Sequence, residues 1–381
     1  MALRRMLGWA LATLLGLAPT AQAAEELRLG AFLSLTGTYT FMGDPEKKAL
    51  ELLVERTNST GGVLGRPIRL IAYDDGSDPE KAMTAAKRLI ENDRVDFIIG
   101  GSGTPTSMAV LPLMEKAGMP FVSMGGGIGI VEPVRNWTFK IPHSDRMGAE
   151  KVLTDLKRRG LTRLALLSEN VGFGKSGRDQ VLKLAPSMGI EVVADEIYGP
   201  KDADVTPQLT KIRGTNGVQA LFVFGTGQGP AVVTRNIRQL GLDMPVYQSH
   251  GVVSKEFLRL VSGAADGMRL PAMALAVAEQ LPANDPQKPV ALAFKAAFEA
   301  RWHQEATIFA GHAADAFAMV TEALRRAGSA DKAQLRGQIE RTKGLVGTGG
   351  IFTMTPTDHL GLDLGSFHMV EIRNGDWVLV D

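Results

Sequence analysis

The chain has 381 residues, of which 45% are hydrophobic and 22% are charged, the balance of an ordinary globular protein. This length suggests about two domains. A formal net charge of +1 argues against a nucleic-acid-binding surface. The absence of cysteine excludes disulfides, so an exported form would depend on its hydrophobic core for stability.

The N-terminal segment has the pattern of a secretory signal peptide. Arg4 and Arg5 precede an apolar run, Met6–Leu17, which is followed by Ala21-Gln22-Ala23. This order predicts cleavage after Ala23. The alternative is a membrane anchor, but the run is shorter than the roughly 20 residues that a spanning helix needs. With no cysteine at the cleavage site we expect no lipid anchor, and we predict a monomeric mature protein in the periplasm.

The first part of the mature chain alternates between strand and helix patterns. The predicted strands are Leu27–Leu35, Ile68–Tyr73, Val95–Ile99 and Pro120–Ser123. The predicted helices are Pro45–Thr57, a segment from Pro79 through Glu91, and a segment from Pro105 to Gly118. Repeated strand–helix units predict a parallel, doubly wound sheet with right-handed crossovers.

A second series of the same kind begins after Lys140–Asp145, which we interpret as a crossing between domains. Its predicted strands are Leu164–Ser168, Ile190–Tyr198, Ala220–Phe224 and Pro245–Gln248. Its predicted helices are Arg146–Arg159, Lys175–Met188, Pro207–Gly214, Pro230–Leu240 and Lys255–Val261.

Another crossing is expected near Gly267–Met273. Three helices follow it and are expected to return to the first domain: Val290–Trp302, Ile308–Arg326 and Ala330–Thr342. The tail predicts a hairpin of Phe367–Arg373 and Trp377–Val380 around an Asn-Gly turn, which we assign to the second domain.

The prediction is therefore an α/β protein of two Rossmann-like lobes, with parallel doubly wound sheets joined by three crossover strands. The N-terminal lobe would hold residues 24–142 and 274–350, and the C-terminal lobe residues 143–273 and 351–381, after a signal peptide of residues 1–23. Ligands of open α/β sheets bind outside the carboxyl ends of the strands, so we expect a cleft between the lobes that closes by a hinge motion.

Two glycine-rich loops point to an anion site in that cleft. The strand Val95–Ile99 ends in Gly100–Thr104, and the strand Pro120–Ser123 ends in Met124–Gly127. Small residues let a ligand approach backbone N–H groups, and the helix that begins near Pro105 adds a partial positive charge. This combination predicts a site for a small anion, either a carboxylate or a phosphate.

Two possible nucleotide-binding motifs are less well supported. Gly172–Gly177 matches the dinucleotide pattern G-x-G-x-x-G, with Asp195 about twenty residues later, which leaves an NAD-dependent enzyme as one alternative. Three observations argue against NAD binding. The turn between the strand and the helix is longer than the dinucleotide motif has, the motif lies in the middle of the chain, and an exported protein would find no pool of nicotinamide cofactor. Glu169 stands where a P-loop needs glycine, which excludes that motif.

Catalytic and metal motifs are also missing. The serines lack a G-x-S-x-G frame, and the histidines lack a spacing such as H-E-x-x-H, so we expect no enzyme, metal or cofactor. We interpret Asp74-Asp75 as a solvated turn that caps the next helix rather than as a metal pair. His250 follows a predicted strand and would face the cleft.

Several short segments together resemble one known family. They are Leu35-Thr36-Gly37, Met42-Gly43, Gly61–Ile68, Tyr73-Asp74-Asp75, Asp78-Pro79 and Phe173-Gly174. The family is the type I periplasmic binding proteins of the leucine/isoleucine/valine-binding class, the substrate-binding subunits of ABC transporters. The resemblance implies the two-lobed fold, a small-molecule ligand, and a membrane permease as partner.

The resemblance also implies a set of ligand-binding positions. Thr104 matches the hydroxyl residue whose backbone and side chain hold the ligand carboxylate, and Gly125 and Gly127 match the next carboxylate contacts. The backbone amides of all three are expected to be unpaired. Three positions that often carry tyrosine in this family are occupied by Met42, Phe173 and Gly227. His250 falls where amino-acid binders place an acid that pairs the ligand ammonium.

The last departure suggests a ligand without an ammonium group, because a buried ammonium with no carboxylate partner would cost several kcal/mol. We expect a carboxylate with an apolar or aromatic body, such as an aromatic acid or a 2-oxo acid. Phe173, Phe309 and Phe41 are candidates to pack against the ring. An ordinary branched-chain amino-acid binder, with its acid supplied from elsewhere, remains open, as does a periplasmic sensor module.

Overall fold

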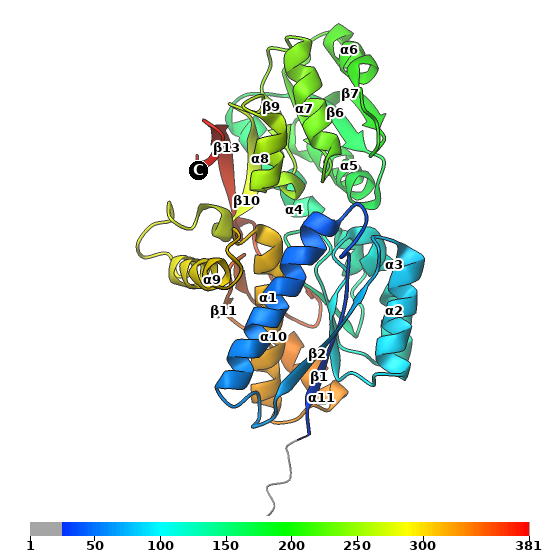
Figure 1. The fold of residues 1–381 in the computed structure, drawn as a ribbon. Helices are drawn as coiled ribbons and strands as arrows, with labels where there is room; N and C mark the ends of the chain where they lie inside the picture. The colour runs from blue at the N-terminus through cyan, green and yellow to red at the C-terminus, as the bar shows by residue number, and fades with distance from the viewer. Residues whose placement is uncertain (1–24, 381) are drawn as a thin grey trace, which may run out of the picture.

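The computed structural model describes residues 25–380, and the predicted signal peptide lies outside them. The chain forms two α/β lobes stacked end to end, each built around its own sheet (Figure 1). Three segments connect the lobes: the one after β5, the one after β10 and the one before β13. The predicted fold class is confirmed.

The N-terminal lobe contains a five-stranded sheet of order β2-β1-β3-β4-β5, in which all paired strands are parallel. Its strands are β1 (Leu27–Leu33), β2 (Ile68–Asp74), β3 (Phe97–Gly100), β4 (Phe121–Ser123) and β5 (Thr138–Lys140). Its helices are α1 (Thr40–Ser59), α2 (Pro79–Glu91), α3 (Thr104–Ala117), α10 (Ile308–Ala327) and α11 (Lys332–Glu340).

Strand β1 shows why this sheet is covered on both faces. Leu29, Ala31 and Leu33 belong to the hydrophobic cluster that includes residues of α1 and α10. Phe32, on the opposite face, packs with residues of α2 and α3. Alternate side chains of a strand point to opposite faces, so burial on both faces makes consecutive residues of this strand, from Leu29 to Leu33, non-polar.

The C-terminal lobe contains a seven-stranded sheet of order β14-β13-β10-β9-β8-β6-β7. Its strands are β6 (Arg163–Glu169), β7 (Glu191–Tyr198), β8 (Ala220–Phe224), β9 (Val246–Gln248), β10 (Arg269–Met273), β13 (Phe367–Arg373) and β14 (Asp376–Leu379). Its helices are α4 (Asp145–Arg158), α5 (Gly172–Leu184), α6 (Thr206–Gly214), α7 (Gly229–Gln239) and α8 (Lys255–Val261). The C-terminal hairpin joins this sheet through antiparallel pairing of β13 with β10, as predicted.

Two boundaries differ from the prediction. Helix α1 begins at Thr40 and carries Pro45 inside it, so it starts earlier than the proline suggested. The chain after residue 351 stays beside the N-terminal sheet, because Lys140 N–H donates to the His359 carbonyl at 3.0 Å. The final crossing therefore falls shortly before Phe367 rather than at residue 351. Helix α9 (Gln287–Trp302) lies beside the crossings, and a short pair, β11 (Leu345–Val346) and β12 (Ile351–Phe352), precedes the last one.

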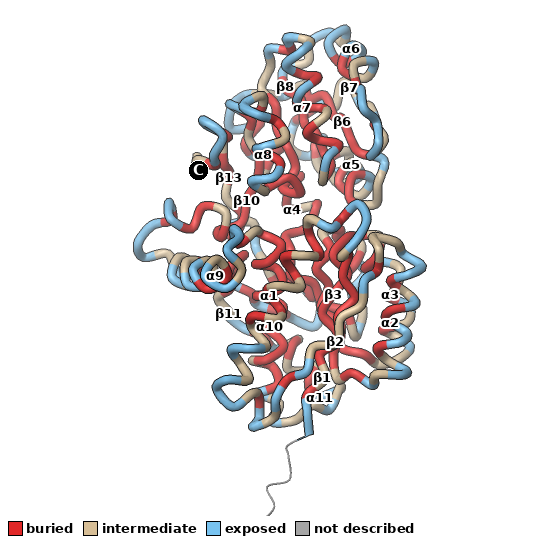
Figure 2. Tube along the Cα trace, viewed as in Figure 1, coloured by how far each residue is buried: buried red, intermediate tan, exposed pale blue. Residues whose placement is uncertain are grey.

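The hydrophobic core continues from one lobe into the other. Figure 2 shows buried segments within each lobe and also where the lobes meet. One cluster of buried side chains includes Leu29 in the first sheet, Ile141 and Met273 near the crossings, and Val223 in the second sheet. Apolar side chains therefore contribute to the region where the lobes meet. Within residues 25–380, no helix has the length and apolar character needed to cross a membrane.

Candidate functional site

The two glycine-rich loops lie side by side, as predicted. Strands β3 and β4 pair in parallel, with Gly100 opposite Ser123, so both loops leave the same edge of the sheet. Helix α3 begins at Thr104 directly after the first loop, with Pro105 in its first turn, where a missing N–H costs nothing. Gly118 ends the helix in a left-handed conformation at φ 58°.

The main correction concerns the second loop, where the backbone amides of Gly125 and Gly127 were predicted to be unpaired. The Gly127 amide donates to Thr104 Oγ1 at 3.0 Å, and the Gly125 amide donates to Ser123 Oγ at 3.1 Å. Hydroxyl side chains of the loops themselves therefore satisfy the two N–H groups that were expected to hold a ligand. The first amides of α3, which have no intrahelical acceptor, are the backbone donors that this geometry leaves for an anion.

A buried carboxyl group forms a hydrogen bond with the first loop. Ser102 Oγ donates to Glu46 Oε2 at 2.5 Å and accepts from the Ser34 amide at 3.1 Å. Burial, reinforced by the nearby charge of Asp75, raises the pKa of Glu46 to about 8, although the Ser102 hydrogen bond opposes the shift. Asp75 is itself buried and bonds Ser34 Oγ at 2.7 Å, so the predicted solvated turn is wrong at this residue. The cap of α2 is Asp78.

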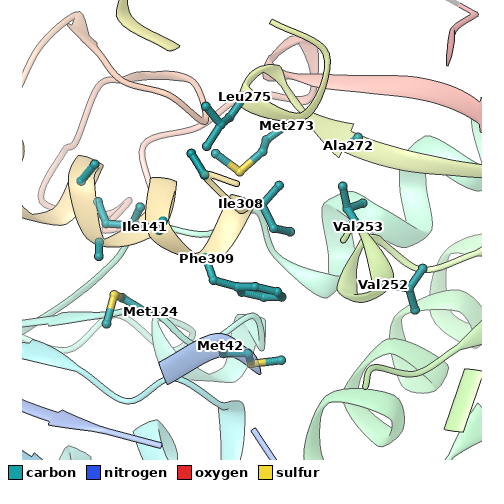
Figure 3. Close-up of a cluster of buried hydrophobic side chains, with 14 of the residues drawn as sticks. Met42, Met124, Ile141, Val252, Val253, Ala272, Met273, Leu275, Ile308 and Phe309 are labelled. Carbon is teal, nitrogen blue, oxygen red and sulfur yellow. The ribbon is translucent and has the colours of Figure 1, made fainter. Parts of the chain in front are cut away.

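A cavity lies between the lobes at the ends of these loops, and the space free of atoms there, including the part open to solvent, is about 460 Å³. Both lobes and the start of α10 contribute to its walls. In Figure 3, Phe309 of α10 reaches between Met42, on α1, and the C-lobe residues Val252 and Val253. The lining residues are Tyr39, Met42, Ser102, Gly103, Thr104, Met124, Gly126, Pro142, Phe173, Thr226, His250, Gly251, Ile308, Phe309 and His312.

The predicted ligand-binding residues divide between three places. Met42, Thr104, Phe173, His250 and Phe309 line the cavity. Phe41 and Gly227 line instead a larger outer groove, together with Glu169, Lys255 and Glu256.

Gly125 and Gly127 lie outside the lining, which includes Gly126 between them. Successive residues of an extended segment face opposite ways, and the ring of Phe173 covers Gly126: a Cβ there would lie 2.9 Å from Phe173 Cε2.

Several lining residues were not predicted. Tyr39 packs its ring over Gly103, where a Cβ would lie 2.9 Å from Tyr39 Cδ2. His312 lies on α10 with Ile308 and Phe309, four and three residues before it. Residues at these spacings share one face of a helix. The placement of Phe309 in the cleft was therefore the sequence signal that could have identified His312.

The side of the cavity next to the lobe crossings is rich in basic groups. His250 and His312 are 8% and 7% exposed, and Nδ1 of each is buried without a hydrogen-bond partner in the structure. Burial, with a contribution from the charge of Lys140, lowers the pKa of each imidazole to about 3. Burial also lowers the pKa of Lys140 to about 7, and its Nζ donates to the Pro142 carbonyl. The imidazoles of His250 and His312 are therefore neutral near pH 7.

Aromatic packing fixes the His250 ring. It makes edge contacts with Phe173 and Phe367, at centroid distances of 5.2 and 5.1 Å. Helix α4 leaves room for the ring at Gly148, where a Cβ would lie 2.5 Å from His250 Nδ1. A residue larger than glycine at position 148 would displace the imidazole.

Comparison with known proteins decides the family. A family model described as periplasmic binding protein matches residues 26–375. The chain belongs to the periplasmic binding protein family.

Individual similarities agree with this assignment. A Pseudomonas aeruginosa protein named leucine-, isoleucine-, valine-, threonine-, and alanine-binding protein is 24% identical over 91% of this chain and 88% of its own length. A crystal structure of an extracellular ligand-binding receptor from Rhodopseudomonas palustris HaA2 is 29% identical, with a TM-score of 0.87 over 93% of this chain and all of that one.

A further similarity shows the fold alone. The branched-chain amino acid transporter substrate-binding protein of Streptococcus pneumoniae, solved with isoleucine, is 21% identical, with a TM-score of 0.81 over 93% of this chain and 100% of that chain.

This periplasmic binding protein also has a carboxyl group near the cavity that sequence reasoning missed. Glu169, at the end of β6, is 3% exposed, and its Oε2 accepts from the Thr226 amide at 3.0 Å. Burial raises the pKa of Glu169 to about 7. Its charge adds to burial in raising the pKa of Tyr39, across the cleft, to about 12. Glu169 lines the outer groove, whereas Thr226 lines both spaces.

The glycines of Gly172–Gly177 are explained by packing. A Cβ at Gly174 would lie 2.1 Å from the Glu169 carbonyl oxygen, and one at Gly177 would lie 2.0 Å from the Phe224 ring. A Cβ at Gly172 would lie 3.0 Å from Pro105 Cγ, across the cleft. Close packing of α5 against β6, β8 and the opposite lobe therefore accounts for glycine at these positions without a dinucleotide.

Proposed function

We propose that this protein is the substrate-binding component of an ABC transporter and captures a small carboxylate with an apolar or aromatic body and no ammonium group. Aromatic acids and 2-oxo acids have this chemistry. One observation carries the proposal: among the described residues, the cavity lining contains neutral imidazoles but no aspartate or glutamate. An ammonium ion placed there would lack the counter-charge that burial demands.

The transport role rests on the relatives. The Pseudomonas aeruginosa protein is named for branched-chain and related amino acids, and the Streptococcus pneumoniae protein is named as a transporter component. If this protein has the same role, it would act as a periplasmic monomer that delivers its ligand to permease subunits in the inner membrane. It would catalyse no reaction.

The walls suit the two parts of such a ligand. The carboxylate would meet the first amides and the positive end of the α3 dipole beside Thr104. The apolar body would contact Met42, Phe173 and Phe309, because these side chains line the cavity. Removing this apolar surface from water supplies binding energy, at roughly 25 cal/mol for each Å². Closure of the lobes would complete the enclosure.

Calorimetry with the signal-free protein tests the ligand class. Benzoylformate and 4-hydroxybenzoate are expected to bind, and leucine is expected to bind at least about tenfold more weakly, for want of an ammonium partner. A thermal-shift screen of both classes gives an independent reading, since ligand at 100 times its Kd adds about 2.7 kcal/mol of stability. Tight leucine binding without binding of either acid would contradict the proposal.

Glu169 favours a second candidate, a branched-chain amino acid whose ammonium pairs with this carboxyl group. A cation nearby would offset the desolvation that raises the pKa of Glu169. In that case Glu169→Gln would weaken leucine binding about tenfold or more, because the ammonium loses its charged partner. Glu256→Gln is the matched control, because Glu256 lines the outer groove and is exposed.

A further inference from the structure

Two buried imidazoles border the cavity near the lobe crossings and come from different lobes. His312 belongs to α10, which packs in the N-terminal lobe, and His250 to the turn after β9 in the C-terminal lobe. Both line the cavity, and Nδ1 of each is buried without a hydrogen-bond partner. Buried polar atoms without partners are rare in folded proteins, and each one calls for an explanation.

The unpartnered nitrogens constrain the tautomer. A neutral imidazole carries its proton on one nitrogen, and that nitrogen must find an acceptor when it is buried. Placing the proton on Nε2 leaves only a lone pair without a partner at Nδ1. For His250 the backbone carbonyl of His143 is close enough to act as a hydrogen-bond acceptor. Among the described residues His312 has no hydrogen-bond partner, and its Nε2, unlike its Nδ1, is not a buried unpartnered atom, so an Nε2–H is open to the cavity that His312 lines.

Further basic side chains lie near the pair. The charge of Lys140, at the end of β5, acts on both imidazoles, and both imidazoles act on His143 in the first crossing. Two buried carboxyl groups accept hydrogen bonds from backbone amides. Asp145 Oδ1 accepts from the Ile128 amide while its Oδ2 is unpartnered, and Asp315 accepts from the amides of Thr348 and Gly349. Within residues 25–380, no His, Cys, Asp or Glu cluster is placed to hold a metal ion.

We infer that His312 is a ligand-recognition residue whose N–H donates to a second oxygen of the ligand, separate from the carboxylate. This inference rests on the proposed function, and it narrows the ligand class. The preferred molecule has an apolar or aromatic body between two oxygen-bearing groups: a carboxylate at the start of α3 and a hydroxyl or second acidic oxygen at His312. A ligand without the second oxygen leaves the imidazole N–H buried and unpaired.

Benzoate and 4-hydroxybenzoate form a matched pair of probes, since they differ by one oxygen. The unaltered protein is expected to bind 4-hydroxybenzoate about tenfold more tightly than benzoate, the difference made by one buried hydrogen bond. His312→Leu should abolish this preference, so that the two acids bind with similar Kd values. His312→Gln keeps a side-chain N–H and should retain part of the preference.

The outcomes separate the inference from the proposed function. If His312→Leu weakens both acids equally, His312 holds the carboxylate or only shapes the fold, and the inference fails. If the unaltered protein binds both acids alike, the inference fails while the proposed function stands. Failure of every acid to bind would contradict the proposed function itself.

A measurement on the unaltered protein covers the case in which the variants do not fold. In nitrogen NMR of the imidazoles, 4-hydroxybenzoate is expected to shift the His312 Nε2 resonance, and benzoate is not. Equal shifts with both acids, or no shift with either acid when both bind, would overturn the inference.

Discussion

The two sides of the cavity satisfy their polar groups in different ways. Beside α3, hydroxyl groups, amides and a buried carboxyl group bond one another: Thr104 Oγ1 holds the Gly127 amide, and Glu46 holds the Ser102 hydroxyl. Beside the crossings, the imidazoles of His250 and His312 keep unpartnered nitrogens. On the first side the loop amides are therefore held by the protein's own hydroxyl groups, although Glu46 Oε1 and Asp75 Oδ2 are also unpartnered, whereas on the second side the unpartnered atoms are imidazole nitrogens.

The same comparison holds for protonation. Burial is the largest cause of the pKa shifts on both sides of the cavity. It raises the pKa of an acid, Glu46, beside α3, and it lowers the pKa of two bases, His250 and His312, beside the crossings. Glu46 has its pKa raised above the unfolded value, so its contribution to stability is complete below pH 4.5 and is lost as the pH rises towards 8. The histidines have their pKa lowered, so their contribution is complete above pH 6.5 and is lost as the pH falls towards 3.

The largest expected effect is at Glu46. Replacing it by glutamine keeps an oxygen that accepts from Ser102 and removes the cost of holding a buried carboxyl group protonated. At pH 7 this cost is about 3 kcal/mol, from a pKa of about 8 in the folded protein against 4.5. Urea unfolding of Glu46→Gln should show a gain in stability that grows between pH 4.5 and 8.

Glu51→Gln is the matched control on the same helix. Glu51 is 38% exposed and pairs with Lys47 at 3.3 Å, so its replacement should change the unfolding free energy by no more than about 0.5 kcal/mol. A gain for Glu46→Gln that does not depend on pH would show that the carboxyl group is not held protonated, and the contrast between the two sides would be lost.

The second effect concerns the hydroxyl groups that satisfy the loop amides. Thr104→Val keeps the shape of the side chain but removes the acceptor of the buried Gly127 amide. An unsatisfied buried donor costs about 1–3 kcal/mol, so the unfolding free energy should fall by that amount. Thr104→Ser retains the oxygen and should stay close to the parent protein. Equal stability of the valine and serine variants would mean that the amide finds another acceptor.

Much of the fold could be predicted from local patterns. The helix after β3 was recognised from Pro105 at its start and Gly118 at its end, and both residues occupy those positions. The C-terminal hairpin was recognised from Asn374-Gly375, and it pairs within the predicted sheet. These signals depend on a few neighbouring residues, whose backbone preferences act wherever the segment lies in the fold.

The candidate site was less predictable because its contacts join distant parts of the chain. Gly125 and Gly127 were expected to have free amides, and the sequence does not show that Ser123 and Thr104 would bond them. Glu169 was noted only as a residue that a phosphate loop excludes. His312 was grouped with unremarkable histidines, because its place in the cavity depends on α10 returning to the first lobe.

The smallest expected effect separates the cavity from the outer groove. Phe41 was predicted to pack against the ligand ring, but it lines the groove and contacts Phe309 edge-on at a centroid distance of 5.4 Å. Phe41→Leu should therefore weaken binding of 4-hydroxybenzoate less than about threefold, because Phe41 acts only through the Phe309 ring and a loss of about 0.5 kcal/mol, the low end for one aromatic pair, is roughly twofold in Kd. Phe173→Leu is the matched change inside the cavity, and it should weaken binding about tenfold, because this ring covers Gly126 and meets His250 directly. If calorimetry found the opposite order, the ligand would lie in the groove, and the carboxylate site beside α3 would have to be abandoned together with the role of His312.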